Sequence, residues 1–127
     1  MKVIRYPDHN ATSGDSGSIG KFFKNLKKKR PGLWFMVYRT IEEVEAASNL
    51  KSFERQDWVD RLSSSKYPLY EFKIPPKKRG GVVRLYFAYK KNKPNTIIIL
   101  SAELKKKKKA DPEKIKQAEQ RYQEVCL

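Results

Sequence analysis

The side chains best suited to chemistry in this sequence are cations on candidate strands and turns. Arg84 lies within the candidate strand from Val82 to Tyr89. Val83, Leu85 and Phe87 would lie on one face of this strand, and Arg84 on the other. A charge in the middle of such a strand is costly unless it is paired or lies on a functional face. A guanidinium can fork onto two phosphate oxygens. Arg84 is therefore a candidate phosphate ligand, and an ordinary ion pair with Glu71 is the alternative.

Two clusters of cations follow the candidate strands. One lies in a turn rich in Pro and Gly at residues 75–81, and the other is the run of five lysines at residues 105–109. Adjacent ammonium groups repel one another, so a polyanion would stabilise them, although a simply solvated loop is the alternative for each cluster. The candidate phosphate-backbone contacts are Lys77, Lys78, Arg79, Lys106, Lys107, Lys108 and Lys109.

The net charge agrees with this interpretation. The chain carries 29 Lys and Arg against 14 Asp and Glu, which gives a formal charge of +15. Such an excess repels itself in a compact state unless a polyanion is near. Nucleic acid is the expected partner and an anionic membrane surface is the alternative, and binding to nucleic acid should weaken steeply with salt.

Cysteine usage and hydropathy indicate the compartment. Cys126 is the only cysteine, so no internal disulfide can form, which suits a reducing compartment. One cysteine and one histidine, His9, make a metal site improbable, and we expect no metal or other cofactor. The longest apolar runs are far shorter than the ~20 residues of a membrane span. The N-terminus has no signal-peptide core, so a cytoplasmic location without membrane contact is expected.

The elements that must position the cations can be placed by periodicity. The length of 127 residues fits a single domain. Residues 2–6 predict a short strand, and residues 8–17 a polar loop that we expect to be flexible. Apolar side chains at helical spacing then predict one helix that closes at Lys27 to Arg30, and a second from about Leu33 to Ala47. The break between them predicts a helical hairpin.

The second half of the chain alternates as strands do. Residues 57–62 are expected to form a short helical turn. Short runs joined by turns then predict antiparallel strands over residues 68–74, 82–89 and 96–104. Asp111 is the predicted N-cap of a last helix, with Pro112 at its first position. The predicted fold is α+β: an antiparallel sheet of three to four strands, with an N-terminal helical hairpin and a C-terminal helix.

Three local signatures, in this order, resemble a known family. Leu69-Tyr70-Glu71-Phe72-Lys73 is similar to one strand of the RelE/HigB-type toxins, and Val83-Arg84-Leu85-Tyr86-Phe87 is similar to the next. A third signature is an apolar strand that runs into a lysine pair and a helix started by proline. It is matched by Ile97 to Leu100, Lys105-Lys106 and Asp111-Pro112. The resemblance spans about residues 16–125 and implies a RelE-like fold.

The resemblance also implies an activity. Most such toxins cut messenger RNA, commonly on the ribosome and without a metal, by attack of the RNA's own 2′-hydroxyl on the adjacent phosphate. The reaction needs a proton acceptor, positive charge on the phosphorane and a donor for the leaving oxygen. The candidate catalytic residues are Arg84, Lys73 and Lys105, at positions that the resemblance matches, and Glu103, at a position where the sequence departs from the family. The implied partner is an antitoxin, and the charge of +15 independently predicts that it is acidic.

The proton-transfer groups depart from the family pattern. Ser101-Ala102-Glu103 stands where many members carry a histidine or an aromatic residue. Glu103, Glu54 and Asp57 are candidate bases, and Tyr86 is a candidate acid or base-stacking group. Tyr122 lies on the apolar stripe of its helix, so we expect it to pack in the core. A non-catalytic RNA- or ribosome-binding module and a gyrase-inhibiting toxin of the same fold stay open as alternatives.

Overall fold

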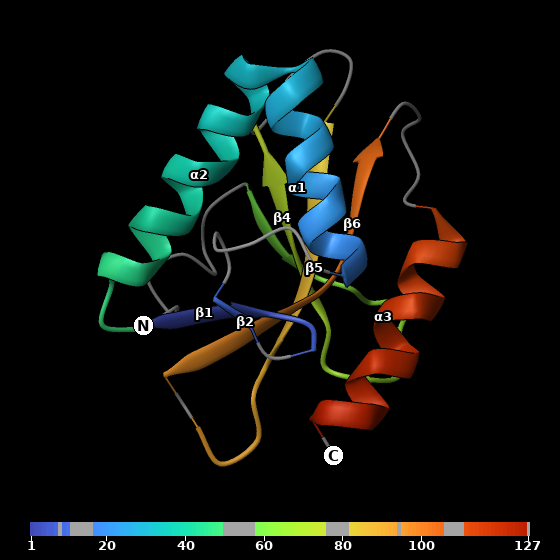
Figure 1. Cartoon of the computed structure of the whole chain (residues 1–127). Helices are drawn as coiled ribbons and strands as arrows, with labels where there is room; N and C mark the ends of the chain where they lie inside the picture. The colour runs from blue at the N-terminus through green and yellow to red at the C-terminus, as the bar shows by residue number, and fades with distance from the viewer. Residues whose placement is uncertain are drawn as a thin grey trace.

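The computed structural model of the chain describes residues 1–7, 9–10, 17–49, 58–75, 82–93, 95–105 and 111–126. Over these residues the protein is an α+β fold in which helices pack on both faces of one open sheet (Figure 1). The described helices are α1 (Gly17–Lys29), α2 (Pro31–Ala46) and α3 (Pro112–Val125). The α+β class predicted from the sequence is confirmed. No helix in these ranges is long and apolar enough to cross a bilayer.

The sheet is mixed, with its longest strand near the middle. The described strands are β1 (Lys2–Arg5), β2 (His9–Asn10), β3 (Val59–Arg61), β4 (Tyr70–Ile74), β5 (Val82–Tyr89) and β6 (Thr96–Lys105). They form one sheet in the order β2-β1-β6-β5-β4-β3. All neighbours are antiparallel except β1 and β6, which run parallel. The ten-residue strand β6 therefore lies between two groups of strands, with β1 and β2 on one side and β5, β4 and β3 on the other.

The expectation of an antiparallel sheet of three to four strands was wrong in two respects. Within the described residues the sheet has six strands, and β1 joins it in parallel to β6. The sequence predicted β1 itself but not its partner. A strand from the N-terminus can pair with either edge of a meander, and local pattern carries no information on which edge or direction is used.

β3 corrects a second expectation. Residues 57–62 were expected to form a helical turn, but Val59, Asp60 and Arg61 pair antiparallel with β4. Val59 is buried opposite Phe72. A short segment has weak intrinsic preference, so the free edge of β4 decides its conformation.

The loop expected at residues 8–17 is only partly described. His9 and Asn10 form β2 against β1, and α1 already begins at Gly17. Both observations shorten the expected loop. Residues 8 and 11–16 lie outside the described part of the chain, so the expected flexibility stays a prediction.

The helical hairpin is confirmed, with one residue between its helices. α1 ends at Lys29 and α2 starts at Pro31, so only Arg30 separates them. Lys27, Lys28 and Lys29 occupy the last turn of α1, where cations complement the carbonyl end of the helix dipole. Pro31 stands at the first position of α2, where its missing N–H costs nothing.

The two faces of the sheet bury two separate cores. The hairpin covers one face, through the buried residues Ile19, Phe23, Leu26, Val37, Ile41 and Val44. α3 covers the other face, through Ala118 and Tyr122. The predicted core position of Tyr122 is confirmed. Alternation along β5 serves both cores: Val83, Leu85 and Phe87 face the hairpin, and Tyr86 and Ala88 face α3.

α3 begins as the sequence predicts. The Asp111 carboxylate accepts a hydrogen bond of 3.0 Å from the backbone N–H of Glu113, and Pro112 is the first helical residue. Glu113 adds a negative charge in the first turn, which the helix dipole favours.

Arg121 ties α3 to the irregular part of β6. The register of β5 and β6 shifts between Tyr86 and Phe87, which leaves Leu100 as the extra residue of a bulge. The Arg121 guanidinium donates to the Leu100 carbonyl at 2.8 Å and to the Ser18 hydroxyl of α1 at 2.8 Å. It also lies over the ring of Tyr6, 4.5 Å from its centroid. One side chain thus joins β6, both outer layers and the segment after β1.

We expect Arg121→Met to lower the free energy of unfolding by about 1–3 kcal/mol, because the Leu100 carbonyl and the Ser18 hydroxyl each lose a donor. Urea unfolding followed by circular dichroism measures the loss. Lys116→Met, which removes an exposed cation from the same helix, is the matched control and should change stability by less than about 0.5 kcal/mol. Equal losses in the two variants would contradict the role given to Arg121.

Candidate functional site

Strand register brings the predicted catalytic residues onto one face. Arg84 on β5 lies between two neighbours, Lys73 on β4 and Glu103 on β6, with which it is directly paired. Directly paired residues point to the same side of a sheet, and so does Lys105, two positions after Glu103. This is the side on which α3 packs, since Tyr86 shares it. We call Lys73, Arg84, Glu103 and Lys105 the cationic cluster.

Arg84 forms the ion pair that was the alternative to a phosphate contact. Its Nη1 lies 2.9 Å from Glu71 Oε2, and the side chains are 15% and 7% exposed. The buried Arg84 Nε makes no hydrogen bond among the described residues. Pairing with Glu71 makes this buried charge affordable, and it leaves one donor of the guanidinium unused.

Burial dominates the titration of Glu71. Removal from water raises the pKa of its carboxyl above the ordinary value of 4.5, although the Arg84 guanidinium acts in the opposite direction. Glu71 therefore takes up a proton at a higher pH than an ordinary surface glutamate does.

Lys73 is paired with an acid that sequence reasoning did not single out. Its Nζ lies 2.5 Å from Asp60 Oδ2 on β3, and the two side chains are 28% and 50% exposed. Asp60 was missed because its segment was read as a helical turn. The signal was present in the sequence, since Asp60 alternates with the apolar Val59 as strand residues do.

Lys105 is the most enclosed lysine of the cluster. It is 8% exposed at the end of β6, and the ion pairs of Arg84 and Lys73 do not include it. Burial lowers the pKa of its ammonium group, and the positive charge of Arg84 lowers it further. A lysine with a lowered pKa gives up its proton more readily, which suits a proton donor.

Glu103 is held by two donors. The buried hydroxyl of Tyr86 donates a short hydrogen bond to Glu103 Oε1, and the backbone N–H of Asp111 donates to Oε2 at 3.2 Å. Burial and the bond to Glu103 raise the pKa of Tyr86 well above its ordinary value. Tyr86 therefore stays protonated at neutral pH and fixes the orientation of Glu103.

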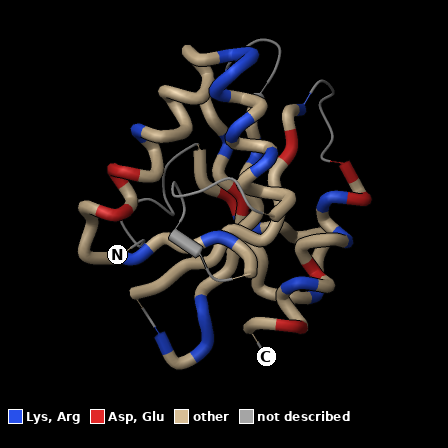
Figure 2. Tube along the Cα trace, viewed as in Figure 1, with Lys and Arg blue, Asp and Glu red and all other residues tan. Residues whose placement is uncertain are grey.

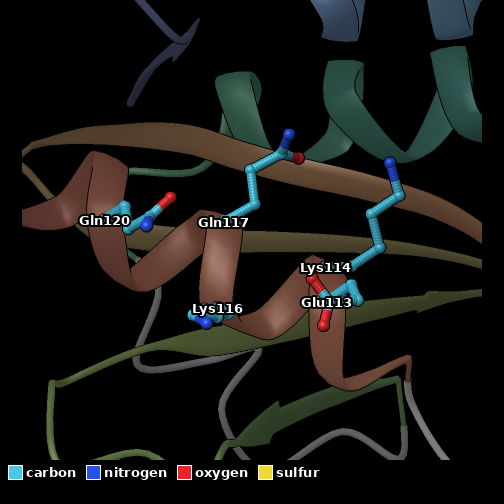
Figure 3. Close-up of a pocket in the computed structure, with 5 residues that line it drawn as sticks. All are labelled: Glu113, Lys114, Lys116, Gln117 and Gln120. Atoms are coloured by element: carbon cyan, nitrogen blue, oxygen red, sulfur yellow. The ribbon is translucent and has the colours of Figure 1, made fainter.

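A surface hollow along α3 touches the edge of this arrangement. It is lined by Glu113, Lys114, Lys116, Gln117 and Gln120, all from one helix (Figure 3). Figure 3 shows Lys114 and Gln117 extending to the same side of α3. The Gln117 carboxamide oxygen accepts a hydrogen bond of 2.9 Å from the hydroxyl of Ser101, which lies two positions before Glu103 on β6. The hollow contains no member of the cationic cluster, so we place the candidate site on the sheet.

The remaining candidates lie outside the described residues. These are Lys77, Lys78, Arg79, Lys106, Lys107, Lys108 and Lys109 among the RNA contacts, and Glu54 and Asp57 among the bases. Val82 and Lys105 border residues 76–81 and 106–110, which lie outside the described part of the chain. Val82 pairs with Lys105, so these two bordering residues lie at the same end of the sheet. The roles given to all these residues, and to the cationic cluster, stay predictions.

The fold and the cationic cluster together define a small basic α+β protein with a group of charged side chains on one face of its sheet. A family model described as phage derived protein Gp49-like (DUF891) matches residues 19–123, and the chain belongs to this family. The family is associated with RelE-like toxins of toxin–antitoxin systems, which supports a toxin role and implies a cognate antitoxin. No curated protein and no solved structure shows significant similarity to the chain.

We expect Glu71→Gln to change how stability depends on pH. A carboxyl whose pKa is raised on folding binds more protons in the folded state, so the wild-type protein loses stability as pH rises from 4.5 through the raised pKa. Glutamine does not titrate, so the variant lacks this fall. Urea unfolding at a series of pH values up to neutrality measures the difference.

Glu43→Gln, at an exposed position of α2, controls for the loss of one negative charge. The stability of wild type relative to Glu71→Gln should decrease as the pH rises. A constant or increasing difference would show that burial does not control Glu71.

Proposed function

We propose that this protein is the toxin of a toxin–antitoxin pair, and that it cleaves messenger RNA in the cytoplasm, on the ribosome. The RNA's 2′-hydroxyl attacks the adjacent phosphate, and the products are a 2′,3′-cyclic phosphate and a free 5′-hydroxyl. The observation that supports the proposal is that Lys73, Arg84, Glu103 and Lys105 share one face of the sheet, with Arg84 between Lys73 and Glu103.

Charge on the phosphorane is the first requirement of this reaction. Arg84 has an unused Nε donor, and its ion-pair partner Glu71 is a buried carboxyl. A phosphate oxygen that approaches Arg84 gains a charge-assisted hydrogen bond, and Lys73 on the adjacent strand adds a second positive charge. Preorganised cations of this kind stabilise a transition state more than a ground state, because the negative charge on the phosphorane is greater.

Proton transfer is the second requirement. Glu103 accepts the proton of the 2′-hydroxyl while Tyr86 and the Asp111 N–H hold it in place. As the bond between phosphorus and the 5′-oxygen breaks, Lys105 gives its proton to that oxygen. The lowered pKa of Lys105 favours this transfer. This mechanism uses no metal ion. Glu103 takes one proton from the RNA and Lys105 gives one to it.

The antitoxin has a clear electrostatic requirement. A chain of charge +15 is self-repelling, and an acidic partner removes that repulsion while it covers surface that would otherwise meet RNA. Neutralisation by an acidic protein is therefore part of the proposal.

We expect Arg84→Ala to abolish growth arrest on expression in bacteria and to slow RNA cleavage by at least about 100-fold, the loss typical of one charge-stabilising donor. Purified protein is incubated with ribosomes and messenger RNA in the presence of a metal chelator. Detection of 2′,3′-cyclic phosphate ends measures cleavage. Arg84→Lys keeps the charge but loses the fork, so its rate should fall between the two.

Lys91→Ala is the matched control, because it removes an equal charge from the exposed turn after β5, at the opposite end of that strand. It should cleave like wild type. Binding to ribosomes or RNA without any cut by folded wild-type protein would favour the non-catalytic module. Inhibited DNA supercoiling without RNA cleavage would favour the gyrase-inhibiting toxin.

A further inference from the structure

The first turns of α2 expose large apolar side chains. Phe35, Met36 and Tyr38 are 61%, 43% and 39% exposed, and they are the exposed large hydrophobic residues of the described chain. Successive positions of a helix are 100° apart, so Met36 and Tyr38 flank Phe35 on the outer arc of α2. We call these three residues the hairpin patch. Phe35 and Tyr38 are three residues apart and so are neighbours on the helix surface, and Met36 lies about 100° round the helix from Phe35. Single exposed apolar residues are ordinary, whereas neighbouring ones are candidates for an interaction surface.

Tyr38 of the hairpin patch is supported by an aromatic side chain beneath it. Tyr38 lies at the surface in ring contact with Trp34, with centroids 6.1 Å apart. Trp34 in turn packs on Phe23 of the core at 5.2 Å. An aromatic side chain held in this way loses little conformational entropy on binding, which is a property of interface anchors.

The charges that precede and accompany the hairpin patch in the sequence have one sign. From Lys27 to Thr40 the chain carries no carboxylate and five cations, which are Lys27, Lys28, Lys29, Arg30 and Arg39. The acids of α2 begin only at Glu42, on the later turns of the helix. Figure 2 shows this separation, with Lys and Arg at the turn between the helices and Asp and Glu toward the other end of α2.

We propose that the hairpin patch docks an acidic amphipathic helix of the antitoxin. The apolar arc fits the apolar stripe of such a helix, and the surrounding cations fit its acidic flanks. Because Glu42 and Glu43 would repel acidic flanks, the bound helix crosses the tip of the hairpin and does not run along α2. The inference rests on the toxin–antitoxin part of the proposed function and is independent of RNA cleavage.

The position of the hairpin patch separates it from the cationic cluster. The hairpin packs on one face of the sheet, and the cluster lies on the opposite face, which α3 covers. A helix docked at the hairpin patch therefore leaves the cluster uncovered. Docking and RNA binding should be compatible, so neutralisation of the cluster requires another segment of the antitoxin.

A synthetic peptide tests the docking directly. The probe is a stapled helix of about 18 residues, long enough to hold a helix, with Leu along one face and Glu elsewhere. It is titrated into the isotopically labelled full chain, and amide chemical shifts locate its site. We expect shifts confined to residues 27–40, and the same affinity in the presence of a short single-stranded RNA. A peptide with Lys in place of Glu, and a scrambled acidic peptide, should not bind.

Variants at the hairpin patch sharpen the test. Phe35→Ser should weaken peptide binding at least about tenfold, as loss of an interface anchor does, while Phe35→Leu should retain most of the affinity. Arg30→Gln should weaken binding at low salt, whereas Lys91→Gln, which removes an equal charge elsewhere, should not. RNA cleavage by Phe35→Ser should equal that of wild type, so failure of the docking inference is separable from failure of the nuclease proposal.

Three results would overturn the inference. The first is displacement of the acidic peptide by RNA with shifts on β4 to β6, which would show simple competition for cations. The second is self-association of the protein that Phe35→Ser abolishes, because the hairpin patch would then be a contact between copies. The third is the absence of binding by wild-type protein at millimolar peptide.

Discussion

The pairing of charged side chains on the α3 side of the sheet is the interaction on which the rest of the site depends. A guanidinium or an ammonium group in a packed sheet face costs several kcal/mol unless an anion lies beside it. Glu71 supplies that anion for Arg84, and Asp60 supplies it for Lys73. These carboxylates do not cancel the charge of the chain. They hold two cations in place on adjacent strands.

The sheet continues beyond the strands that carry the cluster, and the added elements contact its charged side chains. β3 pairs with β4 and brings Asp60 to Lys73, and the start of α3 brings the Asp111 N–H to Glu103. Tyr86 is buried beneath Glu103 and belongs to the core that α3 covers. Packing and polar contacts are thus coupled, since a shift of α3 would move a hydrogen-bond donor of the proposed base.

The sheet also divides the molecule into two working sides. The hairpin buries its apolar stripe on one face and presents apolar and cationic residues to the outside, whereas the other face carries the cationic cluster. A partner that must neutralise the protein therefore meets two chemically different surfaces. An apolar surface gives affinity that salt does not screen, and a charged surface gives fast association and competition with RNA.

Much of this protein was determined by the sequence alone. The hairpin with its break at Arg30, strands β5 and β6, and the capped start of α3 follow from periodicity and from local rules for caps and breaks, which need no distant partner. The alternation of β4 and β5 also placed Lys73 and Arg84 near each other. Only the tertiary structure decided that β1 joins β6 in parallel, that residues 59–61 form a strand, and that Tyr38 faces solvent. These depend on which free strand edge or core surface is available, and a short local pattern does not determine that choice.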